Sequence, residues 1–504
     1  MKLTVTGDIN AFYVQTLCMI FFPGEKFVEN QELTEDNPVM HVTVRNDDVG
    51  SHAEATLTYM GKTAHAEKTV NFTPEVTKQR TAKIAAGSVV LSVGGEVLGY
   101  RPSWGMLTGV RPSKVAMEML LNGNSKAKVR KILSSDYNVI PKKAALATDI
   151  ARREQKIMKN PKITDCSIYI SIPFCPSRCS YCSFVSYTTP KLLSLIPAYL
   201  DKLCEELSEV LDTVNELKLN LKTIYIGGGT PTILTPDQLN KLLSLIESKI
   251  DVSSLEEFTL EGGRPDTITA EKLKVAKEHG ITRISVNPQS LNDQVIKSIG
   301  RSHSIEEFYH AFEIAKNSGI KCINTDLIAG LPGDSFKYFS ATFDKIIALE
   351  PENITVHTFC VKKASDILAQ NQNIYSIRGG DVGKCVDYSQ LRAQAAGYLP
   401  YYMYRQKNTV GNFENVGFAL EGTEGLYNIY MMEEVHSILS VGAGAVTKLV
   451  EYYPANIAST KIIRHFNPKY PYEYLDNHSN AQTIAEIKKF YEMHGIGGKN
   501  EDTI

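Results

Sequence analysis

Strands and helices alternate along the middle of this 504-residue chain, and this alternation limits the folds that are open to it. Each apolar, β-branched run is followed by a stretch in which apolar residues have helical spacing. Six runs are predicted to be strands: residues 167–172, 222–229, 257–261, 281–286, 321–328 and 354–359. Repeated strand–helix–strand units predict an α/β fold with a parallel sheet that curls into a barrel or a partial barrel.

Three cysteines follow the first of these strands. Cys175, Cys179 and Cys182 have the spacing CxxxCxxC. Three thiolates can bind three irons of a [4Fe–4S] cluster, whereas a cluster that only transfers electrons normally has four. The fourth iron would then keep an open coordination position, as catalytic metal sites do. Because functional groups of such barrels lie at the C-terminal ends of the strands, the position of this loop favours a catalytic cluster.

A structural zinc site is the alternative for the same three cysteines. Zinc sites more often combine two CxxC pairs, or add a downstream HxxxH pair, and neither pattern is present here. The remaining cysteines are scattered and are interpreted first as small buried apolar residues: Cys18, Cys166, Cys204, Cys322, Cys360 and Cys385. Nine cysteines spread in this way favour a reducing compartment over a disulfide framework.

The overall composition is that of a soluble globular protein. The net charge of −2 provides no general attraction to nucleic acid or to an anionic membrane. The longest apolar run, near residues 12–22, is too short to span a bilayer. The N-terminus lacks the hydrophobic core of a signal peptide, because Asp8 and Asn10 interrupt it. We therefore expect a cytoplasmic protein without a membrane span and without a nucleic-acid partner.

Three regions differ in their patterns. Residues 1–160 predict an N-terminal α+β domain of unknown role, with a hairpin turn at Gly61-Lys62 and a helix after Pro74. Residues 161–378 contain the barrel units. Residues 379–504 predict a C-terminal α+β extension that covers the substrate, in which residues 433–449 combine a helical half with a glycine-rich half.

Further candidate binding groups fall at the ends of the predicted strands. The glycines at 227–229 permit close approach of a ligand to the backbone and could accommodate an amino group. Glu261 could accept hydrogen bonds from a ribose, although a solvated strand end is an equal interpretation. Asp326 lies in an apolar strand, where an unpaired charge is costly, so it needs a partner or a ligand.

Taken together, these segments resemble the radical S-adenosylmethionine (SAM) superfamily. Within it they are most similar to the oxygen-independent coproporphyrinogen III oxidases, in particular to long, N-terminally extended members of Gram-positive bacteria. The motifs that carry the resemblance are YIxIPFC, GGGTPT, a glutamate ending the third strand, RxSxxxQS, an arginine twelve residues later, and DLIxGLPG. The resemblance implies a partial (β/α)₆ radical SAM barrel.

The resemblance also implies roles for individual residues. Cys175, Cys179 and Cys182 would bind a [4Fe–4S] cluster. The first SAM would contact Tyr169, Gly228 and Glu261. A second SAM would contact the residues at the remaining matching positions: Tyr181, Gly229, Thr230, Gln289, Arg301, Asp326 and Cys360.

The reaction implied by the resemblance is oxidative decarboxylation of two propionates of coproporphyrinogen III, which gives the vinyl groups of protoporphyrinogen IX. It requires an electron donor such as flavodoxin or ferredoxin. A tetrapyrrole with four carboxylates should meet cationic side chains, because charge-assisted hydrogen bonds to carboxylates are strong. Arg405 and Lys407 are the candidate clamp, although an ordinary packed loop is the alternative interpretation.

Two departures from the family pattern keep other functions open. Phe184 stands where the best-studied branch has a further cysteine, and Glu-Gly-Gly-Arg-Pro replaces Glu-x-Asp-Pro after the third strand. The Cys-Ser-Phe ending resembles haem-binding chaperones, which do not oxidise coproporphyrinogen. A radical SAM enzyme that degrades haem or methylates another tetrapyrrole is a further alternative.

Overall fold

The chain forms two compact units. The computed structural model describes residues 1–27, 36–74, 76–109, 111–182, 186–360, 380–406, 409–453 and 459–497. Unit 1 contains the described parts of Met1–Arg152 and Met403–Glu414, with residues 380–383, and unit 2 contains the other described residues.

Unit 1 is built on a four-stranded sheet with the order β1-β2-β3-β4. Its strands are β1 (Lys2–Gly7), β2 (Val39–Asn46), β3 (Gly50–Tyr59) and β4 (Lys62–Asn71). β1 and β2 are parallel, and the other pairs are antiparallel. The predicted hairpin is present, but its turn is formed by Met60 and Gly61, one residue earlier than the predicted Gly61-Lys62, because Lys62 already begins β4. The φ angles of Met60 and Gly61 are 49° and 71°. Two successive positive φ values match the right-handed twist of the paired strands.

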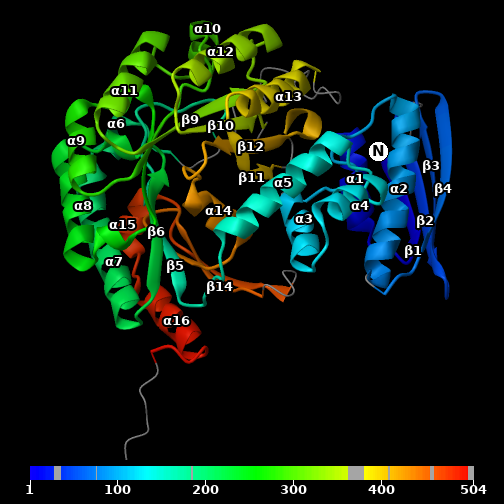
Figure 1. Ribbon diagram of the computed structural model, residues 1–504, viewed down its shortest axis with the longest axis horizontal. Coiled ribbons are helices and arrows are strands. Elements are labelled where there is room, and N and C mark those ends of the chain that lie inside the picture. The colour runs from blue at the N-terminus through cyan, green and yellow to red at the C-terminus, as the bar shows by residue number, and fades with distance from the viewer. Residues whose placement is uncertain are drawn as a thin grey trace, which may run out of the picture. The chain divides into compact units, whose positions relative to one another are not determined.

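Helices cover one face of this sheet (Figure 1). The covering helices are α1 (Ala11–Phe21) and α2 (Lys78–Leu98). Three further helices follow along the chain: α3 (Pro112–Leu121), α4 (Lys126–Ser135) and α5 (Pro141–Ile157). α2 begins at Lys78 rather than directly after Pro74, because the Thr77 side chain accepts a hydrogen bond from Arg80 N and caps the helix there. In the described part of the chain, only α2 is long and apolar enough to cross a membrane, and most of it is buried against β3, β4 and α1.

Unit 2 contains the predicted parallel strands. They are β5 (Asp165–Ile172), β6 (Asn220–Gly228), β7 (Glu257–Gly263), β8 (Arg283–Val286), β9 (Cys322–Ala329) and β10 (Asn353–Thr358). These six lie side by side in sequence order in an eleven-stranded sheet. β5 and β10 do not pair with each other, so the sheet stays open, as expected for a partial barrel.

Later segments extend this sheet at both ends. The strands are β11 (Leu399–Arg405), β12 (Glu414–Ala419), β13 (Ser437–Val441), β14 (Val446–Glu451) and β15 (Lys461–Phe466). β12 pairs antiparallel with β10, and β13 pairs parallel with β5. The expected helical half of residues 433–449 is therefore wrong, since Ser437–Val441 is a fully buried strand. A short run that is buried on both faces shows no periodicity that separates a strand from a helix.

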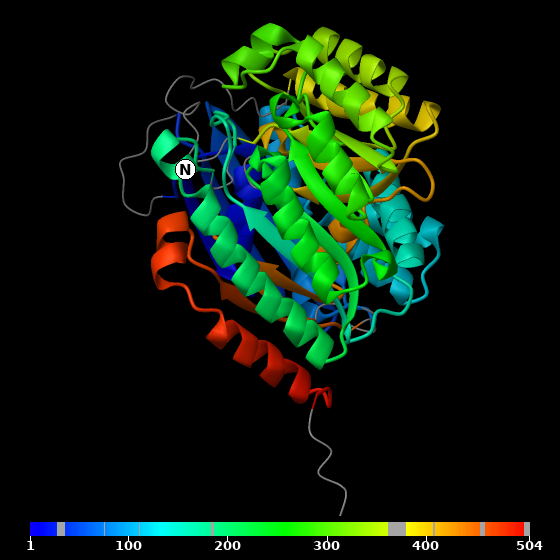
Figure 2. The same cartoon turned by 90° about the vertical axis from the view of Figure 1, so that its left-hand side faces the viewer.

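Helices surround the outer side of the parallel strands, as Figure 1 and Figure 2 show. They are α7 (Ile196–Glu216), α8 (Pro236–Lys249), α9 (Ala270–Glu278), α10 (Asp293–Ser298), α11 (Ile305–Asn317) and α12 (Phe336–Ala348). The strand side chains that face these helices are apolar and fully buried. Ile168, Ile224 and Phe258 are examples, and they share one row of the sheet. Burial of this apolar layer fixes the register of the strands.

The inner face of the same strands is polar. Tyr169, Tyr225 and Thr259 lie in one row across it, followed by Arg283 in β8. A helix from the C-terminal region, α14 (Leu426–Glu433), lies inside the curve of the sheet (Figure 1). We use the word lumen for the interior of the curved sheet, where side chains of this inner face pack against α14.

A buried ion pair connects the start of α14 to the sheet. Arg283 Nε donates to Glu257 Oε2 at 3.0 Å, and its Nη2 donates to the carbonyl oxygens of Thr423 and Glu424 at 2.7 and 2.9 Å. The backbone N–H of Leu426 donates in turn to Glu257 Oε2 at 2.8 Å. These bonds are made near the starts of β7 and β8, so α14 is anchored at the N-terminal end of the lumen.

Candidate functional site

The three motif cysteines lie in the loop after β5, at the C-terminal edge of the sheet. Cys175 and Cys179 are buried, with 8% and 9% of their surfaces exposed, whereas Cys182 is more accessible. The Thr230 hydroxyl donates to Cys175 Sγ at 3.2 Å. A Cβ at Gly229 would lie 3.0 Å from the same sulfur, so the residue after Gly228 must be small for the two loops to meet.

Burial raises the pKa of the Cys175 thiol to about 11. The hydrogen bond from Thr230 lowers the pKa, and the nearby Cys182 and Cys179 thiols raise it. The three thiols therefore interact electrostatically with one another. Among the described residues, no three His, Cys, Asp or Glu side chains already surround a single point closely enough to share one metal ion. Thiolates that bind three different irons of a cubane do not need to meet at one point.

Arg264 holds the cysteine loop, and this role was not anticipated from the sequence. Its guanidinium donates to Ser177 Oγ at 2.6 Å, to Ser302 Oγ at 2.9 Å, and to both carboxylate oxygens of Asp266 at 3.0 and 2.8 Å. Arg264 is 2% exposed. Arg264 also belongs to the motif Glu-Gly-Gly-Arg-Pro, which departs from the family pattern. This departure was the sequence signal that could have identified Arg264 as a contributor to the site.

Glu261 lies near the end of β7 and is partly buried. It accepts hydrogen bonds from the Gly228 N–H and from the Tyr225 hydroxyl. Burial, followed by the negative charge of Asp326, raises its pKa to about 8. A Cβ at Gly227 would lie 2.7 Å from Glu261 Oε2, which explains glycine there. The structure thus brings the glycine loop and Glu261 together, as expected from their positions at adjacent strand ends.

Three stacked tyrosines form a wall of the lumen beside Glu261. The rings of Tyr225 and Tyr427 are 4.6 Å apart, and Tyr169 lies 6.0 and 6.2 Å from them, with all three planes within 25° of one another. Burial raises the pKa of each phenol, and the charge of Glu261 adds to this effect. Tyr427 belongs to α14 and was not predicted, because no motif marks its segment.

Asp326 on β9 has the partners that its apolar strand demands. Its carboxylate accepts from Asn287 Nδ2 and from Asn324 Nδ2, each at 2.8 Å, and His357 Nε2 lies 3.7 Å away. Burial acts to raise its pKa, but the nearby His357 and the polar side chains of Asn324 and Thr355 outweigh burial and lower the pKa below its ordinary value. Asp326 is therefore an anion inside the lumen.

Arg301 links the cysteine loop to the segment after β8. Its Nη1 donates to the Asn287 carbonyl oxygen at 2.5 Å and its Nη2 donates to the Tyr181 hydroxyl at 3.1 Å. Its guanidinium also hydrogen-bonds with Cys179. Gln289 is buried and has a φ angle of +67°. A left-handed backbone at a residue other than glycine is strained, and such strain is often found at functional sites.

The remaining predicted residues lie elsewhere or outside the described residues. Cys360 is buried just beyond the end of β10. Arg405 belongs to unit 1, where its guanidinium lies over the Trp104 ring and donates to the Leu107 carbonyl oxygen. The substrate role of Arg405 stays a sequence prediction. Lys407 and Phe184 lie outside the described residues.

Comparisons with known proteins agree with this geometry. The family model described as "Radical SAM superfamily" matches residues 169–346, which run from β5 to α12. The oxygen-independent coproporphyrinogen-III oxidase-like protein HemZ of Bacillus subtilis is 35% identical over 496 residues, covering 96% of this chain and 95% of that protein. The chain belongs to this family of radical SAM proteins.

Other relatives of the family match a smaller part of the chain. The heme chaperone HemW of Bacillus subtilis is 37% identical over 39% of this chain and 51% of its own. Coproporphyrinogen III oxidase, anaerobic 1, of Cereibacter sphaeroides is 27% identical over 58% of this chain and 64% of its own. The structure of coproporphyrinogen III oxidase (HemN) from Escherichia coli is 19% identical, covers 66% of this chain and 72% of its own, and has a TM-score of 0.46.

The residues of this radical SAM protein fit the cofactors of its family. Three thiols lie in one loop, a hydroxyl and a glycine support the first of them, and a carboxyl lies beside the adjacent glycine loop. As a member of the family, the protein is a radical SAM oxidoreductase with an iron–sulfur cluster and SAM as cofactors.

Proposed function

We propose that this protein catalyses oxidative decarboxylation of propionate side chains on a coproporphyrinogen-type tetrapyrrole. In each event the propionate loses one hydrogen atom from its β-carbon, CO₂ and one electron, and a vinyl group remains. The electron passes to a one-electron acceptor. The proposal is supported by the likeness to the HemZ protein, which extends across both units rather than the barrel alone.

Cys175, Cys179 and Cys182 would bind three irons of the [4Fe–4S] cluster. When bound, the cluster and SAM supply one-electron cleavage of the sulfonium and thereby the radical that abstracts hydrogen. Deprotonation of the buried Cys175 thiol would accompany metal binding, because the ligand is the thiolate. Arg264 would keep the loop at the strand ends through its bonds to Ser177.

The lumen residues would bind and orient SAM and the substrate. Gly228 and Glu261, beside Tyr169, would contact the first SAM. Because its pKa is about 8, Glu261 keeps its proton at neutral pH in the free protein and can donate as well as accept a hydrogen bond. Tyr181, Gly229, Thr230, Gln289, Arg301, Asp326 and Cys360 are proposed contacts of a second SAM.

A haem carrier without oxidase activity is the second candidate, favoured by the 37% identity to a heme chaperone. Anaerobic reconstitution with iron and sulfide, followed by dithionite, SAM and coproporphyrinogen III, separates the two. We expect protoporphyrinogen formation, detected as protoporphyrin by chromatography after oxidation. Tight haem retention without any vinyl product would support the carrier and contradict our proposal.

Substitution of a single motif cysteine tests the cluster. Cys179→Ala should lose most of its iron and the brown colour, because two thiolates remain for a cluster that needs three. Cys204→Ala, on α7, is the matched control and should keep the wild-type iron content. Equal iron in Cys179→Ala and wild type, measured per chain after reconstitution, would disprove the ligand assignment.

A further inference from the structure

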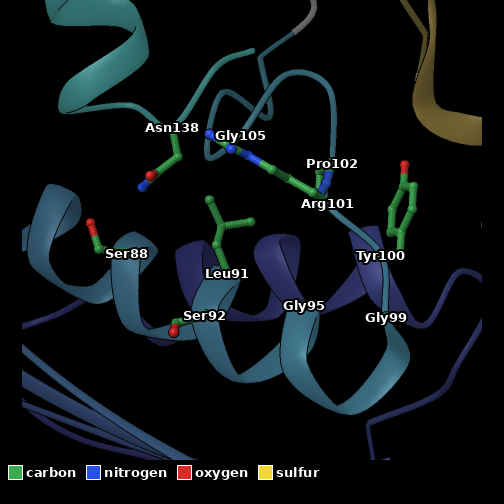
Figure 3. A pocket seen from close by; sticks show the side chains of 10 residues that line it. All are labelled: Ser88, Leu91, Ser92, Gly95, Gly99, Tyr100, Arg101, Pro102, Gly105 and Asn138. Atoms are coloured by element: carbon green, nitrogen blue, oxygen red, sulfur yellow. The ribbon is translucent and has the colours of Figure 1, made fainter.

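A hollow of about 440 Å³ opens in unit 1, between the C-terminal half of α2 and the loop that follows it (Figure 3). On the helix side it is lined by Ser88, Leu91, Ser92 and Gly95. Arg101 and Asn138 lie on the opposite side, as Figure 3 shows. The volume is within the range of small-molecule sites. Neither the motifs nor the proposed reaction accounts for it.

The hollow exists because one face of α2 has small side chains. Ser88, Ser92 and Gly95 are spaced four and three residues apart, so they lie on the same face of the helix. The loop passes over this face without filling it. A Cβ at Gly95 would meet only the Tyr100 carbonyl oxygen, at the ordinary contact distance of 3.4 Å. A larger side chain could therefore be placed there without disturbing the fold.

The loop wall of the hollow packs closely against the segment that contains Tyr137 and Asn138. Gly105 has a φ angle of +51°, and a Cβ there would lie 2.1 Å from the Tyr137 carbonyl oxygen. Asn138, in the facing segment, has a φ angle of +55°. Met106 N–H donates to the Tyr137 carbonyl oxygen at 3.0 Å. Glycine and asparagine are the residue types that adopt this left-handed conformation most readily, so the sequence is suited to the turns of this wall.

Buried contacts behind this wall keep it in place. Trp104, between Pro102 and Gly105, is 1% exposed. Its Nε1–H donates to Glu414 Oε2 at 2.8 Å, and Lys143 Nζ donates to Glu414 Oε1 at 2.5 Å. A site whose walls are fixed in advance loses little conformational entropy when a ligand binds.

The polar groups in the hollow are free to bind a ligand. Within the described part of the chain, the Arg101 guanidinium, the hydroxyls of Ser88 and Ser92 and the Asn138 amide have no hydrogen bond or ion pair. No Asp or Glu is among the residues that line the hollow. One cation with several neutral hydrogen-bonding groups and no acid favours an anion.

We propose that the hollow binds a small organic anion. Its carboxylate or phosphate group pairs with Arg101 and accepts hydrogen bonds from Asn138 or the α2 hydroxyls, and its apolar part lies against Leu91 and Pro102. This site is independent of the proposed reaction, because all of its residues belong to unit 1.

The test uses saturation-transfer NMR on the full-length protein with three probes. Benzoate and phenyl phosphate carry the two candidate anionic groups, and benzamide is the neutral counterpart of benzoate. We expect saturable binding of at least one anion, about ten-fold tighter than that of benzamide, because charge-assisted hydrogen bonds are stronger than neutral ones. Tighter binding of benzoate would identify a carboxylate ligand, and tighter binding of phenyl phosphate would identify a phosphate ester.

Three variants locate the site, because the lumen could also bind carboxylates. Arg101→Gln should weaken the preferred anion about ten-fold, and Gly95→Leu should abolish its binding by filling the hollow. Arg45→Gln, on the exposed face of β2, removes the same charge elsewhere and should bind like wild type. Equal affinity of the anion for wild type, Arg101→Gln and Gly95→Leu would overturn the proposal, as would equal affinity for benzoate and benzamide.

Discussion

Each unit has a sheet with one polar face, but the two faces differ in their exposure to water. In unit 1, the polar face of β2 to β4 is exposed, and its side chains pair across neighbouring strands. The Thr56 hydroxyl oxygen lies 3.0 Å from His65 Nδ1, and the hydroxyl oxygens of Thr58 and Thr63 lie 3.0 Å apart. In unit 2, the polar inner face of β5 to β10 is half-buried to buried, and the side chains of its ion pair, Arg283 and Glu257, are only 9% and 5% exposed.

The difference shows that alternation of polar and apolar residues does not by itself identify a site. Exposed pairs contribute about 0–1 kcal/mol, because water competes for the same groups. A buried polar group without a partner is much more costly, so each lumen residue is held by specific neighbours. The same burial raises the pKa of Glu261 to about 8. Burial of the polar face therefore distinguishes the functional sheet.

The largest effect is expected for the buried ion pair. Arg283→Ala should destabilise unit 2 by about 3–5 kcal/mol, because it leaves Glu257 as an unpaired buried charge. Hydrogen exchange of amides in β7 to β9 measures the loss without interference from unit 1. The control is Arg45→Ala on the exposed face, which should change stability by less than about 0.5 kcal/mol. Similar losses in both variants would remove the contrast between the two faces.

A smaller effect is expected for the arginine that holds the cysteine loop. Arg264→Lys should release iron about ten-fold faster than wild type, since lysine cannot bond Asp266, Ser177 and Ser302 together. Iron release to a chelator measures the rate. Lys274→Ala on the exposed side of α9 is the control and should match wild type. Wild-type iron retention in Arg264→Lys would show that the loop does not depend on this arginine.

Glu261 provides a pH test of the lumen. Between its ordinary pKa near 4.5 and its folded pKa of about 8, the unfolded chain is ionised while the folded protein keeps the proton. Stability should therefore fall as pH rises through this window. Between pH 5 and pH 8, the stability of Glu261→Gln should rise relative to that of wild type by about 1–3 kcal/mol. This is less than the full pKa shift corresponds to, because the carboxyl is partly exposed.

Hydrogen exchange of β7 in the cofactor-free protein at the two pH values measures this difference. Glu256→Gln, just before β7, serves as the comparison. The prediction for Glu261 is wrong if the stability of Glu261→Gln and of wild type changes in parallel between pH 5 and pH 8.

The smallest effect is expected on the exposed face of unit 1. Glu54 and Glu67 lie directly opposite each other on β3 and β4. Glu54→Lys should replace a repulsion by an attraction and stabilise unit 1 by about 0.2–1 kcal/mol, with a smaller gain at high salt. Thermal unfolding at two salt concentrations checks this. A loss of more than about 1 kcal/mol would mean that this face is not simply solvated.

Much of unit 2 could be predicted from the sequence because its strands are separated by amphipathic helices. All six parallel strands are present where the alternation placed them, and Asp326 has the partners that its apolar strand required. The strand Ser437–Val441 could not be predicted, since a short buried run has no distinguishing period. Its neighbour β5 is more than 260 residues earlier in the chain, and no local signal reports such a pairing.

The candidate site was predictable where motifs stand at strand ends, as for Cys175 and Glu261. Two contributors were not predictable. Arg264 acts through Ser177 and Ser302, which approach it only in the folded chain. Tyr427 reaches the lumen because α14 is anchored by the pair of Arg283 with Glu257, a contact between distant segments.

The buried indole of unit 1 has a practical consequence. Trp104 is the single tryptophan of the chain, and its N–H is bonded to the Glu414 carboxylate. Excited at wavelengths that tyrosine does not absorb, the protein will therefore emit only from this position. Intrinsic fluorescence will therefore report the unfolding of unit 1, whereas unit 2, which contains the stacked tyrosines but no tryptophan, will give no emission under this excitation.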